Sequence, residues 1–482
     1  LWLDMNEPAS WCNGECKRRD MEFLDETEDF AKKIHSHDYR FESQEINSTS
    51  LCESCDLNNP PYKINNGGKR LSLDTLTLSM DAVHSKGMVD YDVHNLFGHM
   101  ETMITYKIMG EKINKGKRPF LITRSTFSGT GRYAGHWTGD NWADWSNLYL
   151  SIPGILNFQL FGIPLVGADI CGFNGQSSEE LCLRWMQLGS FYPFMRNHNV
   201  KDERSQEPYN WPSVAETSRK YIGIRYSLLP YYYTLFYEAS VNGTTILRPL
   251  FIEFPHLKPA LESDRQFMLG GGILISPMLL PQHSVILSAY IPPGIWYDFY
   301  THFASFKVKD PKGVYRDLNA PLNEMPIHIR GGYAIPMSHP GMTTTESRNS
   351  NLSLLVALNE EGNAKGSFYL DDGESLNVKN NYTYTIFKTH DRNQLVANVI
   401  WGGYDNGIIL DKIVILGINL QNSMKPAEKV EKVMFNGLEI NPESNSTDEN
   451  ITWKLDKQIG KITFEGLEIK LNVGWNLTWV IY

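Results

Sequence analysis

The sequence predicts an α/β fold followed by all-β structure, namely the C-terminal half of a (β/α)8 barrel and then two β-sandwich domains. In the first half of the chain, short apolar runs that end in charged or polar residues alternate with amphipathic helical stretches, as in a parallel sheet with crossover helices. After Gly243 the pattern changes to short alternating runs separated by Pro and Gly, which is typical of β-sandwiches. With 482 residues the chain is long enough for more than one domain.

Three runs have the character of buried parallel strands. Residues 119–124, 162–169 and 191–199 are largely apolar, and each ends in a charged or polar side chain. Helices are predicted between and after them, from apolar spacing or from capping signals. They are expected at residues 91–111, 148–160 and 178–189, and from a capping box at Ser213 to about Ser240, with a bend at Pro230.

The carboxyl ends of parallel strands share one edge, so polar residues at those ends are expected to face one mouth. These residues are Asp4, Arg124, Asp140, Asp169 and His198. A barrel is preferred to the alternative, a doubly wound sheet, because no glycine-rich phosphate loop follows a strand and aromatic residues occupy the loops. The strands suffice for about half a barrel.

The change in pattern also predicts the domain boundaries. Residues 1–243 are expected to form the C-terminal part of the barrel, with a cysteine-containing insertion at about 11–70. Residues 244–336 would form a proximal β-sandwich and residues 337–482 a distal one.

The net charge of −10 and the lack of a basic block argue against a nucleic-acid partner. The longest apolar run, near residues 268–275, contains glycines and precedes Pro277, so we expect no membrane span in this chain. The apolar run Leu1–Leu3 begins abruptly, like the middle of a strand, which predicts that further chain lies upstream.

Cysteines and glycosylation sequons indicate a secretory-pathway protein, secreted or lysosomal/vacuolar. The cysteines fall as Cys12/Cys16, Cys52/Cys55 and Cys171/Cys182, and local pairing is the simplest interpretation. Cys52 and Cys55 could instead belong to a redox motif or half a zinc site, but no second such motif exists and no metal is expected. Sequons stand at Asn47, Asn242, Asn351, Asn381, Asn445, Asn450 and Asn476.

Residues 132–142 have the composition of a site loop. Gly135 and Gly139 allow close approach of the backbone to a ligand, and Trp137 offers an apolar face beside Asp140. A carboxyl group held against indole has a raised pKa, which would let Asp140 act as a general acid. The alternative is a polar turn with buried aromatic residues.

Several motifs together resemble glycoside hydrolase family 31, the α-glucosidases of the lysosomal, intestinal and secreted fungal type. The segment from Leu1 to Pro8 resembles the family's nucleophile signature, and Arg124–Phe127 with Gly135–Asp140 resembles its acid/base region. Residues 167–173 and 194–199 are similar to its sugar-binding signatures, and residues 368–374 to a motif of its C-terminal domain.

The resemblance implies a retaining hydrolysis in which Asp4 is the nucleophile and Asp140 the general acid/base, without a cofactor. Retention requires two carboxyl groups about 5–5.5 Å apart, one ionised and one protonated at rest. It further implies glucose binding by Arg124, Asp169, Arg196 and His198, with Trp2, Met5, Trp137 and Phe173 shaping the pocket. For His198 or Arg196 taken alone, a hydrogen bond in the core is the simpler alternative.

The resemblance also implies a disulfide between Cys171 and Cys182. The similar cysteine-rich start of fungal-type members implies the pairs Cys12 with Cys16 and Cys52 with Cys55. The family's upstream half is absent from this sequence. We therefore expect the C-terminal chain of a processed enzyme, whose partner would be an N-terminal chain from the same precursor.

The expected activity is that of an exo-acting α-glucosidase, which releases glucose from the non-reducing ends of α-linked gluco-oligosaccharides such as maltose. Alternatives are a transglucosylating enzyme, a glucosidase II-like processing enzyme of the endoplasmic reticulum, or a catalytically inactive carbohydrate-binding homologue. The acidic run Asp371–Glu374 could indicate calcium, but its spacing favours a solvated turn.

Overall fold

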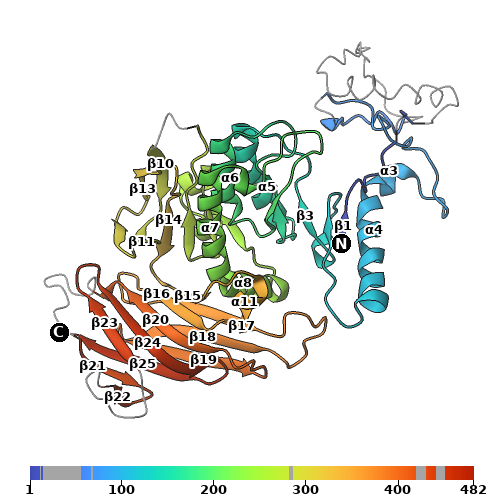
Figure 1. Ribbon diagram of the computed structural model, residues 1–482. Helices are drawn as coiled ribbons and strands as arrows, with labels where there is room; N and C mark the ends of the chain where they lie inside the picture. The colour runs from blue at the N-terminus through green and yellow to red at the C-terminus, as the bar shows by residue number, and fades with distance from the viewer. Residues whose placement is uncertain are drawn as a thin grey trace. The chain divides into compact units, whose positions relative to one another are not determined.

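The computed structural model describes residues 1–10, 12–14, 56–66, 69–281, 286–418, 430–440 and 451–481 (Figure 1). The chain divides into two compact units. The first comprises Leu1–Lys107 with Leu121–Tyr133, and the second comprises Ile108–Phe120 with Ala134–Tyr482. Each unit is described by itself below.

The first unit contains a parallel strand pair and a helix that passes close to it. Strand β1 (Trp2–Leu3) pairs with β2 (Ile122–Thr123), so the two strands end at the same edge. The helix predicted at residues 91–111 is interrupted: α3 (Asp90–Val93) and a 3-10 turn precede α4 (Phe97–Ile108). Gly98 allows the close approach, because a Cβ there would lie 2.5 Å from the side chain of Ser125.

The second unit contains two further parallel strand pairs and four helices, of which α5 contacts β4 and α6 contacts β5. β3 (Gly135–Trp137) pairs with β4 (Val166–Gly167), and β5 (Asp169–Ile170) pairs with β6 (Arg196–Asn197). The helices are α5 (Trp145–Leu160), α6 (Glu179–Gly189), α7 (Pro212–Ser227) and α8 (Leu229–Asn242).

Two helix starts show what the sequence rules captured and what they missed. Ser178 accepts a hydrogen bond from the amide of Leu181 and caps α6, at the predicted position. The capping box predicted at Ser213 is wrong, because α7 begins at Pro212, whose fixed φ suits the first helical position. The Ser213 hydroxyl instead donates a hydrogen bond to Glu179 at 2.5 Å.

The proximal β-region follows as an antiparallel six-stranded sheet, in the order β12-β11-β14-β9-β8-β7, and a second, two-stranded antiparallel sheet of β10 and β13. Two short helices, α9 (Leu250–Glu253) and α10 (Lys258–Glu262), lie between its first two strands in the chain. The strands are β7 (Leu247–Pro249), β8 (Phe267–Leu269), β9 (Ile273–Ile275), β10 (Ile286–Ile291), β11 (Gly294–Asp298), β12 (Ala304–Val308), β13 (Val314–Asn319) and β14 (Ile327–Arg330).

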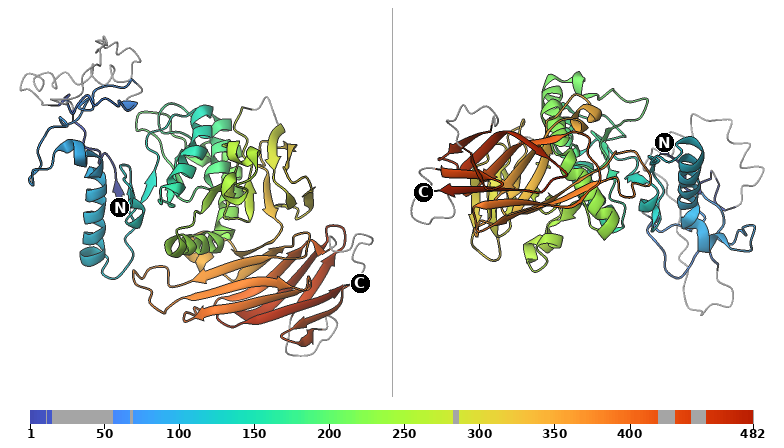
Figure 2. Two further views of the ribbon diagram at one scale, coloured as in Figure 1. Left: turned by 180° about the vertical axis from the view of Figure 1, so that it is seen from behind. Right: turned by 90° about the horizontal axis from the view of Figure 1, so that it is seen from below.

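The distal β-region is one eleven-stranded sheet, in the order β22-β21-β25-β19-β18-β17-β15-β16-β20-β24-β23, which Figure 2 shows in orange and red from two sides. Helix α11 (Thr344–Arg348) connects β15 to β16. The strands are β15 (Tyr333–Ser338), β16 (Leu352–Ala357), β17 (Lys365–Leu370), β18 (Thr383–His390), β19 (Gln394–Gly402), β20 (Ile409–Leu416), β21 (Val430–Phe435), β22 (Leu438–Ile440), β23 (Thr452–Asp456), β24 (Lys461–Lys470) and β25 (Trp475–Ile481).

The predicted order of half a barrel followed by β-sandwich structure is thus confirmed. One buried cluster contains barrel residues such as Trp185 and Tyr221 together with proximal-region residues such as Ile273. A second cluster, which includes Phe464 and Trp479, lies in the distal sheet. The domain boundaries after residues 243 and 336 stay predictions. Within the described segments, no helix is long and apolar enough to cross a membrane.

The acidic run after β17 is only in part the solvated turn that its composition predicted, because Glu374 is exposed and Asp372 is partly exposed whereas Asp371 is not. The side chain of Asp371 is fully buried and forms an ion pair with Arg118. The hydroxyls of Tyr233 and Tyr369 donate further hydrogen bonds to its carboxylate, at 2.5 and 2.9 Å. Asp371 therefore ties three distant segments of the second unit together.

Candidate active site

In the first unit, Arg124 lies between two carboxylates. Its Nη1 atom lies 3.0 Å from Oδ1 of Asp4, and its Nε and Nη2 atoms donate hydrogen bonds to Glu7 at 2.9 and 3.0 Å. Asp4 follows β1 and Arg124 follows β2, so the parallel pairing of these strands brings both side chains to one edge. Sequence reasoning brings Asp4 and Arg124 together but assigns no role to Glu7.

The turn after Asp4 adopts an unusual backbone conformation. Met5 has a φ of 53°, in the left-handed region that side chains other than glycine rarely adopt. Its amide donates a hydrogen bond to Oδ1 of Asp4 at 2.8 Å. Strained residues of this kind cluster at ligand sites because the surrounding structure must hold them in place. Met5 and Trp2, both predicted to shape the pocket, are exposed.

Asn6 fixes the position of this turn. Its side chain is buried, accepts a hydrogen bond from the amide of Ser125 at 2.9 Å, and donates one to the hydroxyl of Thr123 at 2.8 Å. These bonds join the ends of β1 and β2 directly beside Asp4 and Arg124. Asn6 was missed as a positioning residue because its partners lie far away in the sequence.

In the second unit, Arg196 forms an ion pair with the buried carboxylate of Asp169. Arg196 Nη2 donates to Asp169 Oδ1 at 2.6 Å, and Nε donates to the same oxygen at 3.2 Å. The guanidinium also lies over the ring of Trp137, 5.1 Å from its centroid. Two of the predicted glucose-binding residues, Asp169 and Arg196, and the predicted pocket residue Trp137 are therefore in contact.

Phe173 and His198 form a second contact pair, with ring centroids 5.1 Å apart. Asn141 connects the loop of Asp140 to this segment: it donates to the main-chain oxygen of Asp169 at 2.9 Å and accepts from the amide of Phe173 at 2.8 Å. The sequence did not predict this connecting role of Asn141, although its position directly after Asp140 could have indicated a residue of the site.

Asp140 itself is exposed. Of the neighbouring indole rings, Trp137 is buried and Trp142 is half exposed, and the raised pKa expected for Asp140 stays a prediction. Asp4 belongs to the first unit and Asp140 to the second. The spacing of their carboxyl groups therefore stays a prediction.

Gln206 packs beneath the ends of β5 and β6. Its buried side-chain amide donates hydrogen bonds to the main-chain oxygens of Ile170, Gly172 and His198, and to the Asn197 side chain, at 3.0–3.3 Å. The Asn197 side chain in turn donates to the main-chain oxygen of Gln206 at 3.0 Å. Gln206 thus links the backbone segments that carry Asp169, Phe173 and His198.

A disulfide joins Cys171 to Cys182, as predicted. Cys171 has a φ of 74°, and at Gly172 an added Cβ would lie 2.3 Å from the backbone of Ala143, so this turn is tightly packed. Cys12 is also disulfide-bonded. Its predicted pairing with Cys16, and the predicted pair of Cys52 and Cys55, lie outside the described residues.

Of the glycosylation sequons, some lie within the described residues and some lie outside them. Asn242 and Asn381 are exposed, and Asn351 and Asn476 are partly exposed. Asn47, Asn445 and Asn450 lie outside the described residues. Glycosylation of each stays a prediction.

A comparison with known protein families identifies the family to which this chain belongs. Residues 1–235 match the family description "Glycosyl hydrolases family 31 TIM-barrel domain", and residues 243–335 match "Glycosyl hydrolase family 31 C-terminal domain". The chain belongs to glycoside hydrolase family 31. This confirms the family that the motifs indicated.

Relatives of this family 31 chain include an α-glucosidase of Mucor javanicus, 43% identical over 80% of the chain and 45% of the relative. A lysosomal α-glucosidase of Rattus norvegicus is 38% identical over 93% of the chain and 44% of the relative. A crystal structure of a glucosidase II alpha subunit superposes with a TM-score of 0.75 at 28% identity, covering 85% of this chain and 45% of that one. The chain thus spans about half the length of these relatives.

Proposed function

We propose that this chain carries the catalytic carboxylates of a retaining, exo-acting α-glucosidase, which releases glucose from the non-reducing ends of α-linked gluco-oligosaccharides such as maltose. The observation that carries the proposal is the match to family 31, with relatives named α-glucosidase at 43% and 38% identity. The contacts among the predicted site residues support it.

In the proposed mechanism, Asp4 attacks the anomeric carbon while Asp140 protonates the leaving oxygen. Asp140 then removes a proton from water, which hydrolyses the glycosyl-enzyme. The turn at Met5 and the ion pair with Arg124 support a fixed orientation for Asp4. The exposure of Asp140 supports proton exchange with solvent and with a leaving group.

Glucose recognition would rest on the Asp169–Arg196 pair and on His198. Hydrogen bonds to ionised groups are the strong ones, and a carboxylate held by a guanidinium offers a fixed acceptor to sugar hydroxyls. The aromatic faces of Trp137 and Phe173, each in contact with one of these polar groups, would bound the pocket.

The active enzyme would include a further polypeptide segment from the same precursor, which would supply the remaining barrel strands. The length of the relatives supports this, since the chain covers only 45% and 44% of the two described above. We also propose that the enzyme follows the secretory pathway. Three observations support that route: the similarity to a lysosomal α-glucosidase of Rattus norvegicus, the Cys171–Cys182 disulfide and the exposed sequons.

The second candidate is a glucosidase II-like or transglucosylating specificity. The superposition on a glucosidase II alpha subunit, of which one crystal structure is described as bound to alpha3-Glc2, favours the glucosidase II-like specificity, although at a lower identity than the α-glucosidases. The experiment is to compare release of glucose from maltose and from the α-1,3-linked disaccharide nigerose, and to search the products for longer oligosaccharides. Preferred cleavage of nigerose would select the glucosidase II-like alternative.

The main proposal is tested on the whole enzyme with maltose and p-nitrophenyl α-glucoside. We expect α-glucose as the first product, observed by NMR, and loss of turnover with retained substrate binding in Asp4→Asn. Asp140→Asn should lose turnover at the glycosylation step with maltose. The control Asp405→Asn changes an exposed carboxylate that caps a turn, and should keep full activity.

Two results would overturn the proposal. β-Glucose as first product would exclude a retaining mechanism. Absence of glucose release at every pH from acid to neutral would favour the inactive carbohydrate-binding homologue instead.

A further inference from the structure

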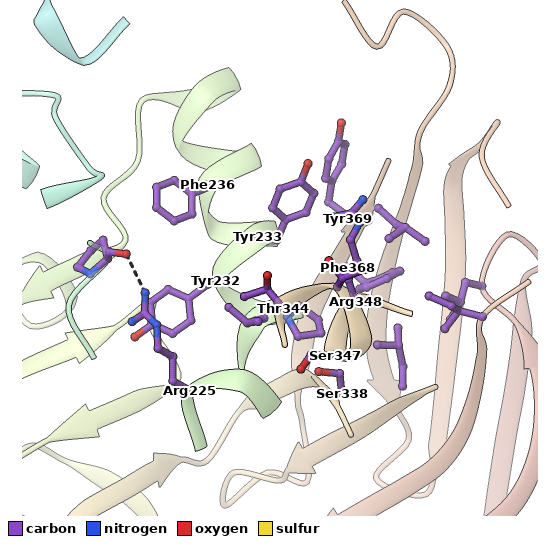
Figure 3. Close-up of a pocket in the computed structure, with 18 residues that line it drawn as sticks. Arg225, Tyr232, Tyr233, Phe236, Ser338, Thr344, Ser347, Arg348, Phe368 and Tyr369 are labelled. Carbon is purple, nitrogen blue, oxygen red and sulfur yellow. Dashed lines mark hydrogen bonds between the residues drawn. The ribbon is translucent and has the colours of Figure 1, made fainter. Parts of the chain in front are cut away.

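A cavity of about 410 Å³ lies within the second unit, between helix α8 and the part of the distal region formed by α11, β16 and β17 (Figure 3). Its volume falls in the range of about 300–1,000 Å³ that small-molecule sites occupy. None of the residues that line it belongs to the candidate active site. A ligand here would therefore bind separately from a glucoside.

The walls of the cavity are mainly apolar. Leu229 and Phe236 contribute from α8, while Leu352, Phe368 and Ile408 contribute from the distal region. Figure 3 shows Phe236 and the ring of Tyr233 on one side and Phe368 on the other. Such walls favour an apolar body, since burial of apolar surface contributes roughly 25 cal/mol per Å².

The charged groups of the cavity all have one sign. Arg225 and Arg348 line it from opposite sides, and none of the lining residues is Asp or Glu. Arg348 has a counter-charge behind it, because its guanidinium lies 3.6 Å from the carboxylate of Asp371. Arg225 donates to the main-chain oxygens of Ser190, Tyr192 and Pro193. Among the described residues, no carboxylate forms an ion pair with it.

A positive charge held at an apolar cavity without a counter-charge is costly, and an anion that enters the cavity would lower that cost. We propose that this cavity binds an amphipathic organic anion, whose flat apolar body packs against Phe236 and Phe368 and whose carboxylate lies between Arg225 and Arg348. A neutral sugar has neither a flat apolar body nor a carboxylate, and its hydroxyls would face mostly apolar walls.

Thr344 allows a charge test that spares the fold. It is the first residue of α11, its side chain is exposed, and Figure 3 shows it between the two arginines. The side chain that caps α11 is that of Thr343, whose hydroxyl accepts a hydrogen bond from the amide of Glu346, so a change at Thr344 leaves this cap in place. Thr344→Glu introduces a negative charge, which a helix N-terminus tolerates well, and Thr344→Gln introduces the same shape without the charge.

The probe is 2-naphthoate, and 2-naphthamide is its neutral counterpart. Binding to the whole enzyme is measured by isothermal titration calorimetry. We expect the acid to bind about tenfold more tightly than the amide, as one charge-assisted hydrogen bond predicts. Thr344→Glu should remove this preference for the acid, whereas Thr344→Gln should keep it, and excess maltose should displace neither probe.

Three outcomes would overturn the proposal. Equal binding of acid and amide would show that the arginines recognise no anion. Equal effects of Thr344→Glu and Thr344→Gln would show that charge at the cavity is irrelevant. Displacement by maltose would place the probe in a glucoside site. Because binding is measured without turnover, each outcome is independent of the proposed activity.

Discussion

The carboxylate of Asp169 is fully buried and accepts two hydrogen bonds from the guanidinium of Arg196, the closer at 2.6 Å. The two residues are also opposite each other in the parallel pairing of β5 and β6. Main-chain pairing therefore holds the two side chains in a fixed geometry relative to each other.

Removal of one member of this pair should damage both stability and substrate binding. Arg196→Met would leave the Asp169 carboxylate buried beside an apolar side chain, and we expect a loss of about 3–5 kcal/mol in the free energy of unfolding. KM for maltose should rise at least tenfold, by the rough value of a lost hydrogen bond to a charged group. Chemical denaturation and steady-state kinetics measure these effects.

Arg196→Lys separates charge from shape, since lysine keeps the charge but lacks the planar fork over Trp137. We expect intermediate values for both quantities. The control Glu262→Gln breaks the exposed pair with Lys258 and should cost less than about 1 kcal/mol with KM unchanged. An unchanged KM in Arg196→Met would remove Arg196 from the proposed glucose site.

Gln206 should act on the same site without contact to the substrate. Its amide nitrogen has only acceptors around it, in both the Asp169 and the His198 segments. In Gln206→Glu the new carboxylate would face these oxygens, so its pKa should be raised and the ionised form should displace the segments. We expect kcat/KM to fall at neutral pH and to recover, relative to wild type, as acid protonates the introduced carboxyl group.

Gln206→Leu should stay impaired at every pH, because leucine supplies no donor. The matched control is Gln159→Glu, since Gln159 is also a buried amide with main-chain partners, at Pro164 and Ile246. That variant should lose stability but keep KM. A pH profile of Gln206→Glu parallel to wild type would show that Gln206 has no positioning role.

The sequence is informative about the site where chemistry is local. The strand ends that carry Arg124, Asp169 and Arg196 are predictable because apolar runs stop there and parallel strands share an edge. Gln206 is not predictable in this way. Its partners on the β5 segment lie 34 and 36 residues earlier, and nothing in its neighbourhood indicates which way the amide turns.

Asp371 is a second residue whose surroundings cannot be predicted from its neighbours in the sequence. Its acidic neighbours predict a solvated turn, yet Arg118 lies 253 residues away in sequence and Tyr233 lies 138 residues away, and both meet it in the fold. Local composition cannot reveal a buried site whose polar partners are so distant. The start of α7 at Pro212 was not predicted because two start signals are adjacent there. Pro212 suits the first helical position and Ser213 suits an N-cap, and the sequence alone does not choose between them.

The Asp371 network should be a main determinant of stability in the second unit. Burial by itself raises the pKa of Asp371, but hydrogen bonds from Tyr233 and Arg118 outweigh it and leave the pKa below its usual value. Asp371→Asn removes the negative charge that matches Arg118, and we expect a loss of about 3–5 kcal/mol. Urea denaturation of the whole enzyme measures it.

The neighbouring carboxylate provides the control for that experiment. Asp372 is partly exposed, unlike Asp371, and accepts hydrogen bonds from the amides of Glu374 and Ser375. Asp372→Asn retains an acceptor for these amides and should cost less than about 1 kcal/mol. Equal losses in the two variants would show that the buried ion pair adds nothing beyond the turn.

Two histidines of the proximal region should make the fold less stable in acid. Burial lowers the pKa of His328 from 6.5 to about 4, with Asp298 opposing the shift. Burial and the charges of Lys461 and Lys412 lower the pKa of His302 to about 4, again against Asp298. The unfolded chain therefore binds more protons than the folded one below pH 6.5, and these groups cost stability increasingly as pH falls to about 4.

Replacement of both histidines should flatten this part of the pH dependence. Asn suits His302, whose φ of 64° is left-handed, and Phe suits His328, which is buried against the ring of Phe306. We expect the Tm difference between pH 7 and pH 4 to shrink in the double variant His302→Asn, His328→Phe, because neither replacement titrates. Exposed His256, changed to Asn, is the control and should leave the difference as in wild type. An unchanged Tm difference between pH 7 and pH 4 in the double variant would show that other groups cause the acid sensitivity.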